Sequence, residues 1–400
     1  MKITFWGVRG VTPTPDLRNL RYGGNTPCVE VRLANGTLII LDCGSGLIGL
    51  GRRLTREFAG SGIRASIFLT HFHWDHIQGL PYFDPLYQPE NSLYFYSSAV
   101  NGLKIRELIE GQMAYPYFPM DASRTKSQRH YHDLLWQPVN LNGAVVKSAP
   151  LNHPQGCAGF RIEADGSAVV FATDTEPGSA FHDRWVRNLA NNADVLIYDA
   201  QYSPHQLSGE KKGWGHSSWL EGTRIARECG VKKLMLFHHD PGSDDHTVDR
   251  FVERARQEFP SVFAAAEGNE IQLPKGDLLK AWPAVSTERR RERRYRLEVP
   301  VRLIWRTPDG HPQVARGFCR DVSRSGVLFD IPAELEIQQS IGLELVLPDE
   351  ITHRGDVAFR FMAQTLRTTP QEGTSLRTGA TVGVAARLSE EVELAERRVA

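Results

Sequence analysis

A dense group of metal-ligating side chains that directly follows an apolar run most constrains what this chain can fold into. Residues 67–70 read Ile-Phe-Leu-Thr, the pattern of a buried β-strand, and residues 71–76 read His-Phe-His-Trp-Asp-His. Three imidazoles and one carboxylate within six residues offer many nitrogen and oxygen donors at the end of one strand. Such a group indicates a metal centre rather than ordinary surface or core histidines. Imidazole and carboxylate ligands suit Zn, Mn or Fe better than Ca or Mg.

The spacing of these residues favours two neighbouring metal ions. Alternation along an extended segment directs His71 and His73 to the same side. The turn that follows can carry Asp75 and His76 towards a second centre, about 3.5–4 Å from the first. Because four ligands cannot complete two sites, further donors are expected at the ends of later strands. The candidates there are His153, Asp174, and either His238 or His239.

Apolar patterning divides the chain into two regions of different architecture. Strand-like runs alternate with helical or polar stretches before residue 280, which predicts a mixed α/β fold. The predicted strands there are 29–32, 37–42, 67–70, 93–97, 168–173, 195–198 and 233–237, and the predicted helices are 100–112, 217–229 and 248–259. The later region predicts a small antiparallel barrel, because turn residues separate its short strands. Those strands are 299–306, 314–321, 326–330, 341–347, 359–366 and 380–386.

Charge, cysteine content and hydropathy exclude several classes of protein. The charges of the 47 basic and 47 acidic residues cancel, which argues against electrostatic binding of the whole chain to bulk nucleic acid or a membrane. Five scattered cysteines without a C-x-x-C pair argue against a disulfide framework or a cysteine-rich zinc site. We find no apolar signal segment and no apolar run near 18 residues, so we expect a cytoplasmic protein. The last lysine is Lys280, which predicts domains over 1–278 and 287–400 joined by a linker over 279–286.

The order of the predicted ligands resembles that of the metallo-β-lactamase superfamily. The motif H-x-H-x-D-H is followed in that family, as here, by a histidine, an aspartate and a histidine. The resemblance implies an αββα sandwich, two β-sheets between helices, over the first domain. It favours His238 over His239, because His238 comes first after its strand. The implied ligands are His71, His73 and His153 for one ion, Asp75, His76 and His238 for the other, and Asp174 as the bridge.

Within that superfamily the chain resembles phosphodiesterases related to tRNase Z. The resemblance implies that His216 is the general acid for the leaving oxygen and that Asp199 orients it. A histidine that caps the helix from Ser217 is the alternative. The predicted catalytic residues are therefore Asp75, Asp199 and His216. The segments that carry the resemblance are 5–10 with 21–26, 193–202 and 214–218.

The implied chemistry favours phosphodiester hydrolysis. Two metal ions lower the pKa of a bridging water, which gives hydroxide at neutral pH, and they neutralise charge on a phosphoryl group. A phosphodiester has a poor alkoxide leaving group, so a proton donor such as His216 is useful. A lactonase or thioesterase, the alternative, would need it less. No long basic arm stands out before residue 280, so we expect a small substrate. The aromatic segment 113–120 either lines a pocket or packs in the core.

Two short motifs in the second domain resemble those of the PilZ domain, a receptor for cyclic di-GMP. The motif R-x-x-x-R is followed about thirty residues later by D-x-S-x-x-G, ahead of further strands. Guanidinium groups bind phosphate bidentately and stack on guanine. The resemblance implies a hydrolase regulated by cyclic di-GMP, with a non-enzymatic effector acting through a partner protein as the alternative. The arginine-rich segment 288–296 could instead be a solvated linker or a basic tract for nucleic acid. A homodimer is a separate open alternative. The implied ligand-binding residues are Arg290, Arg294, Asp321, Ser323 and Gly326.

Overall fold

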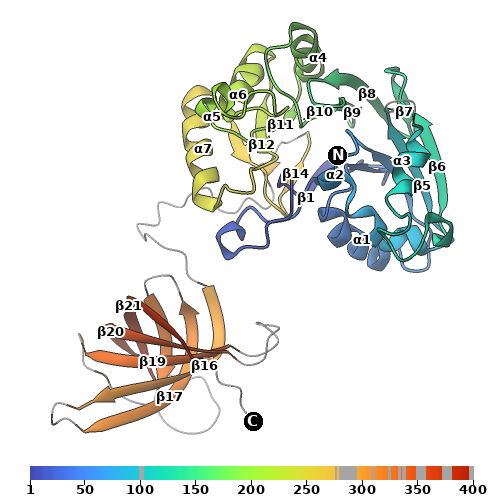
Figure 1. Ribbon diagram of the computed structural model, residues 1–400. Coiled ribbons are helices and arrows are strands. Elements are labelled where there is room, and N and C mark those ends of the chain that lie inside the picture. Colours follow the sequence, from blue (N-terminus) through green and yellow to red (C-terminus); the bar gives the residue numbers. More distant parts are fainter. Residues whose placement is uncertain are drawn as a thin grey trace. The chain divides into compact units, whose positions relative to one another are not determined.

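The chain divides into two compact units, Met1–Val285 and Ser286–Ala400 (Figure 1). The computed structural model describes residues 1–98, 103–274, 277–278, 295–307, 309, 311–322, 326–331, 335, 339–347, 357–371 and 381–395. The predicted linker over 279–286 lies outside the described residues. The domain boundaries at 278 and 287 therefore stay predictions.

Two β-sheets form the centre of the first unit. The eight-stranded sheet has the order β15-β14-β1-β2-β3-β4-β5-β6, and the seven-stranded sheet has the order β13-β12-β11-β10-β9-β8-β7. The strands of the first sheet are β1 Lys2–Gly7, β2 Cys28–Arg32, β3 Leu38–Leu41, β4 Arg64–Phe68, β5 Ser92–Ser97, β6 Gln128–Asp133, β14 Glu270–Gln272 and β15 Asp277–Leu278. Those of the second are β7 Val139–Leu141, β8 Ala144–Leu151, β9 Cys157–Ala164, β10 Ser167–Ala172, β11 Val195–Asp199, β12 Lys233–Phe237 and β13 Val262–Ala264.

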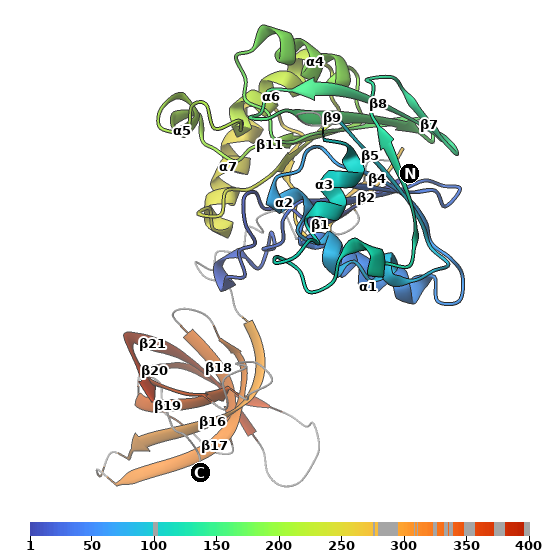
Figure 2. The same cartoon turned by 45° about the vertical axis from the view of Figure 1, so that its right-hand side comes forward.

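Helices cover the outer faces of both sheets (Figures 1 and 2). Those that pack on the first sheet are α1 Gly46–Glu57 and α3 Ile105–Gly111, and those that pack on the second are α4 Ala180–Ala190, α6 Trp219–Glu228 and α7 Asp245–Glu258. The shorter helices are α2 Trp74–Ile77 and α5 Pro204–Ser208, with 3₁₀ turns at Leu17–Asn19, Leu80–Tyr82, Asp84–Tyr87 and Ala122–Arg124. This arrangement confirms the αββα sandwich that the sequence predicts.

Side-chain alternation along the strands builds one core between the sheets and one beneath each helical layer. In β11, Val195 and Ile197 point into the core between the sheets. Leu196 and Tyr198, which alternate with them, pack against the helices of the second sheet. Both faces of this strand are therefore buried, which explains why the sequence shows a continuous apolar run there rather than an alternating one.

Capping residues set the helix starts, which differ by a few positions from those expected. The helix predicted from residue 217 begins at Trp219, because the Ser218 side chain accepts a hydrogen bond from the Glu221 amide. The helix predicted from residue 248 begins at Asp245, because Asp244 caps it in the same way. Both differences place the cap where a short polar side chain can satisfy the first amides of the helix.

The second unit is a closed antiparallel barrel of six strands in the order β16-β17-β18-β21-β20-β19. Val299, Val301 and Leu303 alternate along β16 and fill the barrel interior. The strands are β16 Tyr295–Arg306, β17 Pro312–Val322, β18 Gly326–Ile331, β19 Ser340–Leu347, β20 Val357–Gln371 and β21 Thr381–Ala395. The predicted barrel is thus confirmed.

Two further properties follow from the described residues. Among them, no helix combines the length and the apolar character needed to cross a membrane. All five cysteines are free and buried. Burial raises the pKa of the Cys28, Cys43 and Cys157 thiols, so these side chains stay protonated and unreactive at neutral pH.

Candidate metal centre and active site

The predicted ligands gather at one edge of the sandwich, where strands of both sheets end. Strands β3 and β4 of the first sheet run parallel, as do β10, β11 and β12 of the second. The carboxyl ends of parallel strands meet at the same edge, so residues that follow them in the sequence become neighbours. The ligands come from the segment after β4 (His71, His73), from α2 (Asp75, His76), and from the residues after β8 (His153), β10 (Asp174) and β12 (His238).

One group of donors consists of three imidazoles and one carboxylate oxygen. Ligand atoms of His71, His73 and His153 lie within 4.8 Å of one another. Nε2 of His153 is 3.1 Å from Nδ1 of His73. Oδ1 of Asp174 lies 4.0 Å from Nε2 of His71 and 3.8 Å from Nε2 of His153. Nε2 of His71 is buried and has no hydrogen-bond partner among the described residues.

A second group lies on the other side of Asp174. Nε2 of His76 is 3.3 Å from Nε2 of His238. Oδ2 of Asp75 lies 3.3 Å from each of these two nitrogens, and so does Oδ2 of Asp174. Asp174 therefore directs one carboxylate oxygen to each group, which is the arrangement that a bridging ligand requires.

The hydrogen bonds made by the Nδ1 atoms of the imidazoles show why these donor groups suit a cation. Three imidazoles use Nδ1 to donate a hydrogen bond to an oxygen acceptor, so in the neutral ring Nε2 carries only a lone pair. Those lone pairs face one another and two carboxylates across about 3–4 Å. With neutral rings and no cation this arrangement is repulsive, so the donor set fits divalent metal ions. The hydrogen-bonded pairs are His76 with Asp42, His238 with Gln201, and His153 with the Gly215 carbonyl, each at 2.8 Å.

Asp42 is a functional residue that the sequence reasoning missed. Its fully buried carboxylate accepts hydrogen bonds from Nδ1 of His76 and from the amide and hydroxyl of Thr70. The Thr70 hydroxyl in turn lies 3.0 Å from Nδ1 of His71. Asp42 thus orients one imidazole of each donor group. The signal was present, because an acidic residue that ends an apolar strand is rarely buried without a charged or metal-linked partner.

Backbone conformation helps to direct three side chains towards the site at this edge. Asp42 and His238 directly follow β3 and β12, and Asp174 is the second residue after β10. Their φ values are 60°, 60° and 57°. These left-handed conformations turn the chain sharply at the strand end. Asp and His tolerate this region better than most residues. The donors therefore come from positions where the backbone itself bends towards the site.

A buried histidine–aspartate pair lies beside the two donor groups. Nδ1 of His216 is 2.9 Å from Oδ2 of Asp199, the last residue of β11. The amides of Ser217, Gln201 and Asp174 donate to the same carboxylate, which holds it in place. Burial alone would lower the pKa of His216, but the Asp199 carboxylate outweighs burial and raises the pKa to about 9. The imidazole is therefore charged at neutral pH in the metal-free chain.

His216 does not cap the helix that follows it. Ser218 caps α6, whereas the His216 ring stacks on the His238 ring, with centroids 4.9 Å apart and planes at 21°. Its neighbours thus belong to the donor groups and not to the helix cap.

His239 lies outside all of these groups. Its Nε2 is 2.9 Å from the Ala265 carbonyl oxygen, and its ring is buried. Burial, together with the nearby Arg9 guanidinium, lowers the pKa of His239 to about 3. The geometry therefore groups His238, and not His239, with the other possible ligands.

The aromatic segment 113–120 serves neither of its two expected purposes as a whole. Met113 is buried and packs in the core beneath the first sheet, while Tyr115 and Tyr117 are exposed. Only part of the segment is therefore core.

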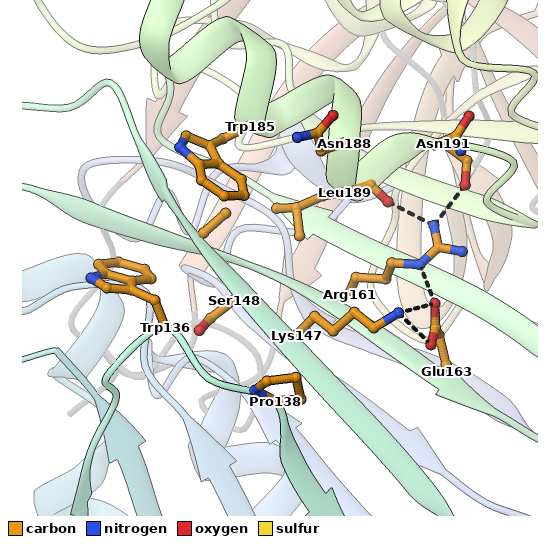
Figure 3. Close-up of a pocket in the computed structure, with 11 residues that line it drawn as sticks. Trp136, Pro138, Lys147, Ser148, Arg161, Glu163, Trp185, Asn188, Leu189 and Asn191 are labelled. Atoms are coloured by element: carbon orange, nitrogen blue, oxygen red, sulfur yellow. Dashed lines mark hydrogen bonds and ion pairs between the residues drawn. The ribbon is translucent and has the colours of Figure 1, made fainter.

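A separate pocket with a volume of about 350 Å³ lies between α4 and strands β8 and β9 of the second sheet (Figure 3). Trp136 and Trp185 line one part of it, and Lys147, Arg161 and Glu163 line another. The charged groups satisfy one another, since both cations bond Glu163 and the guanidinium also donates to two backbone carbonyls. None of its lining residues belongs to the metal-ligating groups, so this pocket is distinct from the candidate active site.

The predicted cyclic di-GMP residues are only partly within the described chain. Arg290, Arg294 and Ser323 lie outside the described residues. Asp321 is in β17, where it pairs with Leu328 of β18, and Gly326 begins β18. The motif D-x-S-x-x-G thus begins in β17 and ends at the first residue of β18, the neighbouring barrel strand.

Comparisons with known proteins agree with this architecture. A family model described as a β-lactamase superfamily domain matches residues 37–239, and one described as a PilZ domain matches residues 288–398. The ribonuclease Z of Methanosarcina acetivorans is 25% identical over 320 residues, which cover 68% of this chain and 98% of that protein. The ribonuclease Z of Thermoplasma acidophilum is 26% identical over 317 residues, covering 68% and 96%.

A crystal structure of similar fold is that of the metallo-β-lactamase fold protein YhfI from Bacillus subtilis. Its TM-score is 0.51 at 22% identity, and the match covers 67% of this chain and 97% of that chain. The two-sheet sandwich and its donor groups define an enzyme of the metal-dependent hydrolase class. The chain belongs to the metallo-β-lactamase superfamily and carries a PilZ domain after its hydrolase domain.

Proposed function

We propose that this protein is a phosphodiesterase that requires two divalent metal ions, with zinc as the first choice and manganese or iron as alternatives. His71, His73 and His153 would hold one ion, Asp75, His76 and His238 the other, and Asp174 both. Such ions supply a water of lowered pKa as nucleophile and neutralise charge on the phosphoryl group.

The observation that carries the proposal is the His216–Asp199 pair beside the donor groups. Asp199 engages Nδ1, which leaves Nε2 to hold the proton that a departing alkoxide needs. Loss of an alkoxide is the difficult part of phosphodiester cleavage, so a positioned proton donor has most value there. The matched relatives are named ribonuclease Z, which supports phosphodiester chemistry for this chain as well. The zero net charge favours a small diester over bulk nucleic acid as the substrate.

The proposal predicts metal-dependent turnover of bis(p-nitrophenyl) phosphate by the full chain. Purified protein is expected to contain two ions by elemental analysis, and a chelator is expected to abolish turnover until Zn, Mn or Fe is restored. If the protein cleaved an RNA oligonucleotide with a kcat/KM comparable to that for the small diester, the proposed substrate would be RNA instead. A fully loaded protein that hydrolyses no diester would exclude the proposed function.

We also infer that the PilZ domain binds cyclic di-GMP and thereby changes the rate of the hydrolase domain. Calorimetry should detect binding, and cyclic di-GMP should shift kcat/KM for bis(p-nitrophenyl) phosphate by roughly 5- to 150-fold, the usual range of coupling between sites. The double variant Arg290→Ala, Arg294→Ala should lose both effects, because the guanidinium groups would hold the phosphates. Arg302→Ala, an exposed arginine on β16, is the matched control. Binding without any change in rate would contradict the regulatory role.

A further inference from the structure

Two exposed tryptophans lie on segments that contribute to the donor group formed by His71, His73 and His153. Trp74 is 64% exposed and lies between His73 and Asp75 at the start of α2. Trp214 is 56% exposed and precedes Gly215, whose carbonyl oxygen accepts the hydrogen bond from Nδ1 of His153. Because Nε2 of His153 and Nδ1 of His73 lie 3.1 Å apart, the segments that carry the two tryptophans meet at the same donor group.

The segment that carries Trp214 is held in place despite its exposure. Gly213 and Gly215 flank it with φ values of 87° and 83°, and their amides each donate to the Glu176 carboxylate at 2.8 Å. Nζ of Lys211 lies 3.9 Å from the centroid of the Trp214 ring, a cation–π contact. An exposed indole that is fixed by its neighbours is preorganised to receive a ligand, since little freedom is lost on binding.

A third exposed apolar residue, Val11, contacts the second donor group through its backbone. The Val11 amide donates to Oδ2 of Asp75 at 2.8 Å, with φ at 67° and the residue 54% exposed. A β-branched residue in the left-handed region is strained, and such strain persists where the surroundings demand it. Scattered exposed apolar residues need no explanation. Here, however, the three residues lie on segments that contact the two donor groups, which favours an apolar or aromatic substrate part next to the reacting phosphate.

We propose that Trp74 and Trp214 are positioning residues that stack on a nucleobase, so that the substrate is a small nucleotide phosphodiester. This inference rests on the proposed phosphodiesterase function and names its substrate class. Flat indole faces suit a planar heteroaromatic group better than a flexible acyl chain, and stacking tolerates any base because every base has a π-face. The indoles would hold the base while the phosphate lies over the donor groups.

Two chromogenic diesters with the same leaving group test this role. Thymidine 5′-(p-nitrophenyl phosphate) carries a base, and methyl p-nitrophenyl phosphate does not. Trp214→Ala and Trp74→Ala are each expected to raise KM for the thymidine ester by roughly 5- to 100-fold, the effect of losing one stacked base, with the loss in KM rather than kcat. The methyl ester should be affected at least fivefold less. Equal effects on the two esters would overturn the proposal.

A binding measurement on the metal-loaded full chain separates this inference from the proposed function. AMP should bind more tightly than ribose 5-phosphate by calorimetry, and each Trp→Ala variant should reduce that preference. Trp136→Ala, at 45% exposure in the separate pocket, is the control and should behave as wild type (Figure 3). If no diester is hydrolysed but the AMP preference depends on Trp74 and Trp214, the proposed function fails and the base site stands. If diesters are hydrolysed but no such preference exists, the base site fails alone.

Discussion

His216→Ala is expected to lower kcat for a diester with an alkoxide leaving group, such as thymidylyl-thymidine, by about 10²- to 10⁴-fold. The reason is geometric: Asp199 holds Nδ1 of the buried ring at 2.9 Å, so that in the proposed function Nε2 would donate the proton to the departing oxygen. A p-nitrophenyl diester should lose far less, because p-nitrophenolate leaves without a proton. The measurement is the ratio of kcat values for the two substrates in wild type and variant.

Metal content must be measured in the same preparations, because His216 stacks on the His238 ring. His205→Ala, an exposed histidine on α5, serves as the matched control and should leave both rates unchanged. Equal losses on both substrates with full metal content would show that His216 has only a structural role.

Asp174→Asn is expected to remove at least one metal ion per chain and to lower kcat/KM by roughly 10³-fold, since charge stabilisation by a catalytic metal contributes several kcal/mol. The variant keeps size and shape but loses the charge that faces both donor groups. Burial by itself would raise the pKa of Asp174, yet the imidazoles of His238 and His76 hold it well below its ordinary value. The carboxylate is therefore ionised, as a bridging ligand must be.

Elemental analysis and thermal unfolding with and without added zinc provide the measurements for Asp174→Asn. Zinc should raise the midpoint of wild type more than that of the variant, because a ligand that binds only the folded state stabilises it by mass action. Asp133→Asn, at an exposed position ending β6, is the control. A variant that retains both ions and its full zinc-dependent stabilisation would contradict the bridging role.

Much of the hydrolase fold is predictable because its strands are buried on both faces and therefore read as short apolar runs. The ligands are predictable for a related reason, since donors within one or two residues of the ends of such runs, as His238 and Asp174 are, share one edge of the sheets. The six barrel strands are also visible as alternating runs. Their pairing is not, because the contact of β18 with β21 joins segments about 55 residues apart in the sequence.

The helix α1 shows why other features escape the sequence. Gly46, Gly49 and Gly51 give this segment poor helix propensity. It forms because Leu47, Leu50 and Leu54 fall on one face and pack against the first sheet, which local sequence does not reveal. Gln201 was missed for the same reason, because its hydrogen bond is to an imidazole that only the fold brings to it.

The left-handed residues at the ends of β3, β10 and β12 have a consequence for the evolution of this edge. Each such conformation costs a non-glycine residue about 1–2 kcal/mol, so backbone energetics alone would select glycine at Asp42, Asp174 and His238. Glycine carries no ligand and no carboxylate. These positions are therefore places where conformational stability is given up for chemistry, and a relative that had lost the chemistry would be free to drift towards glycine or asparagine there.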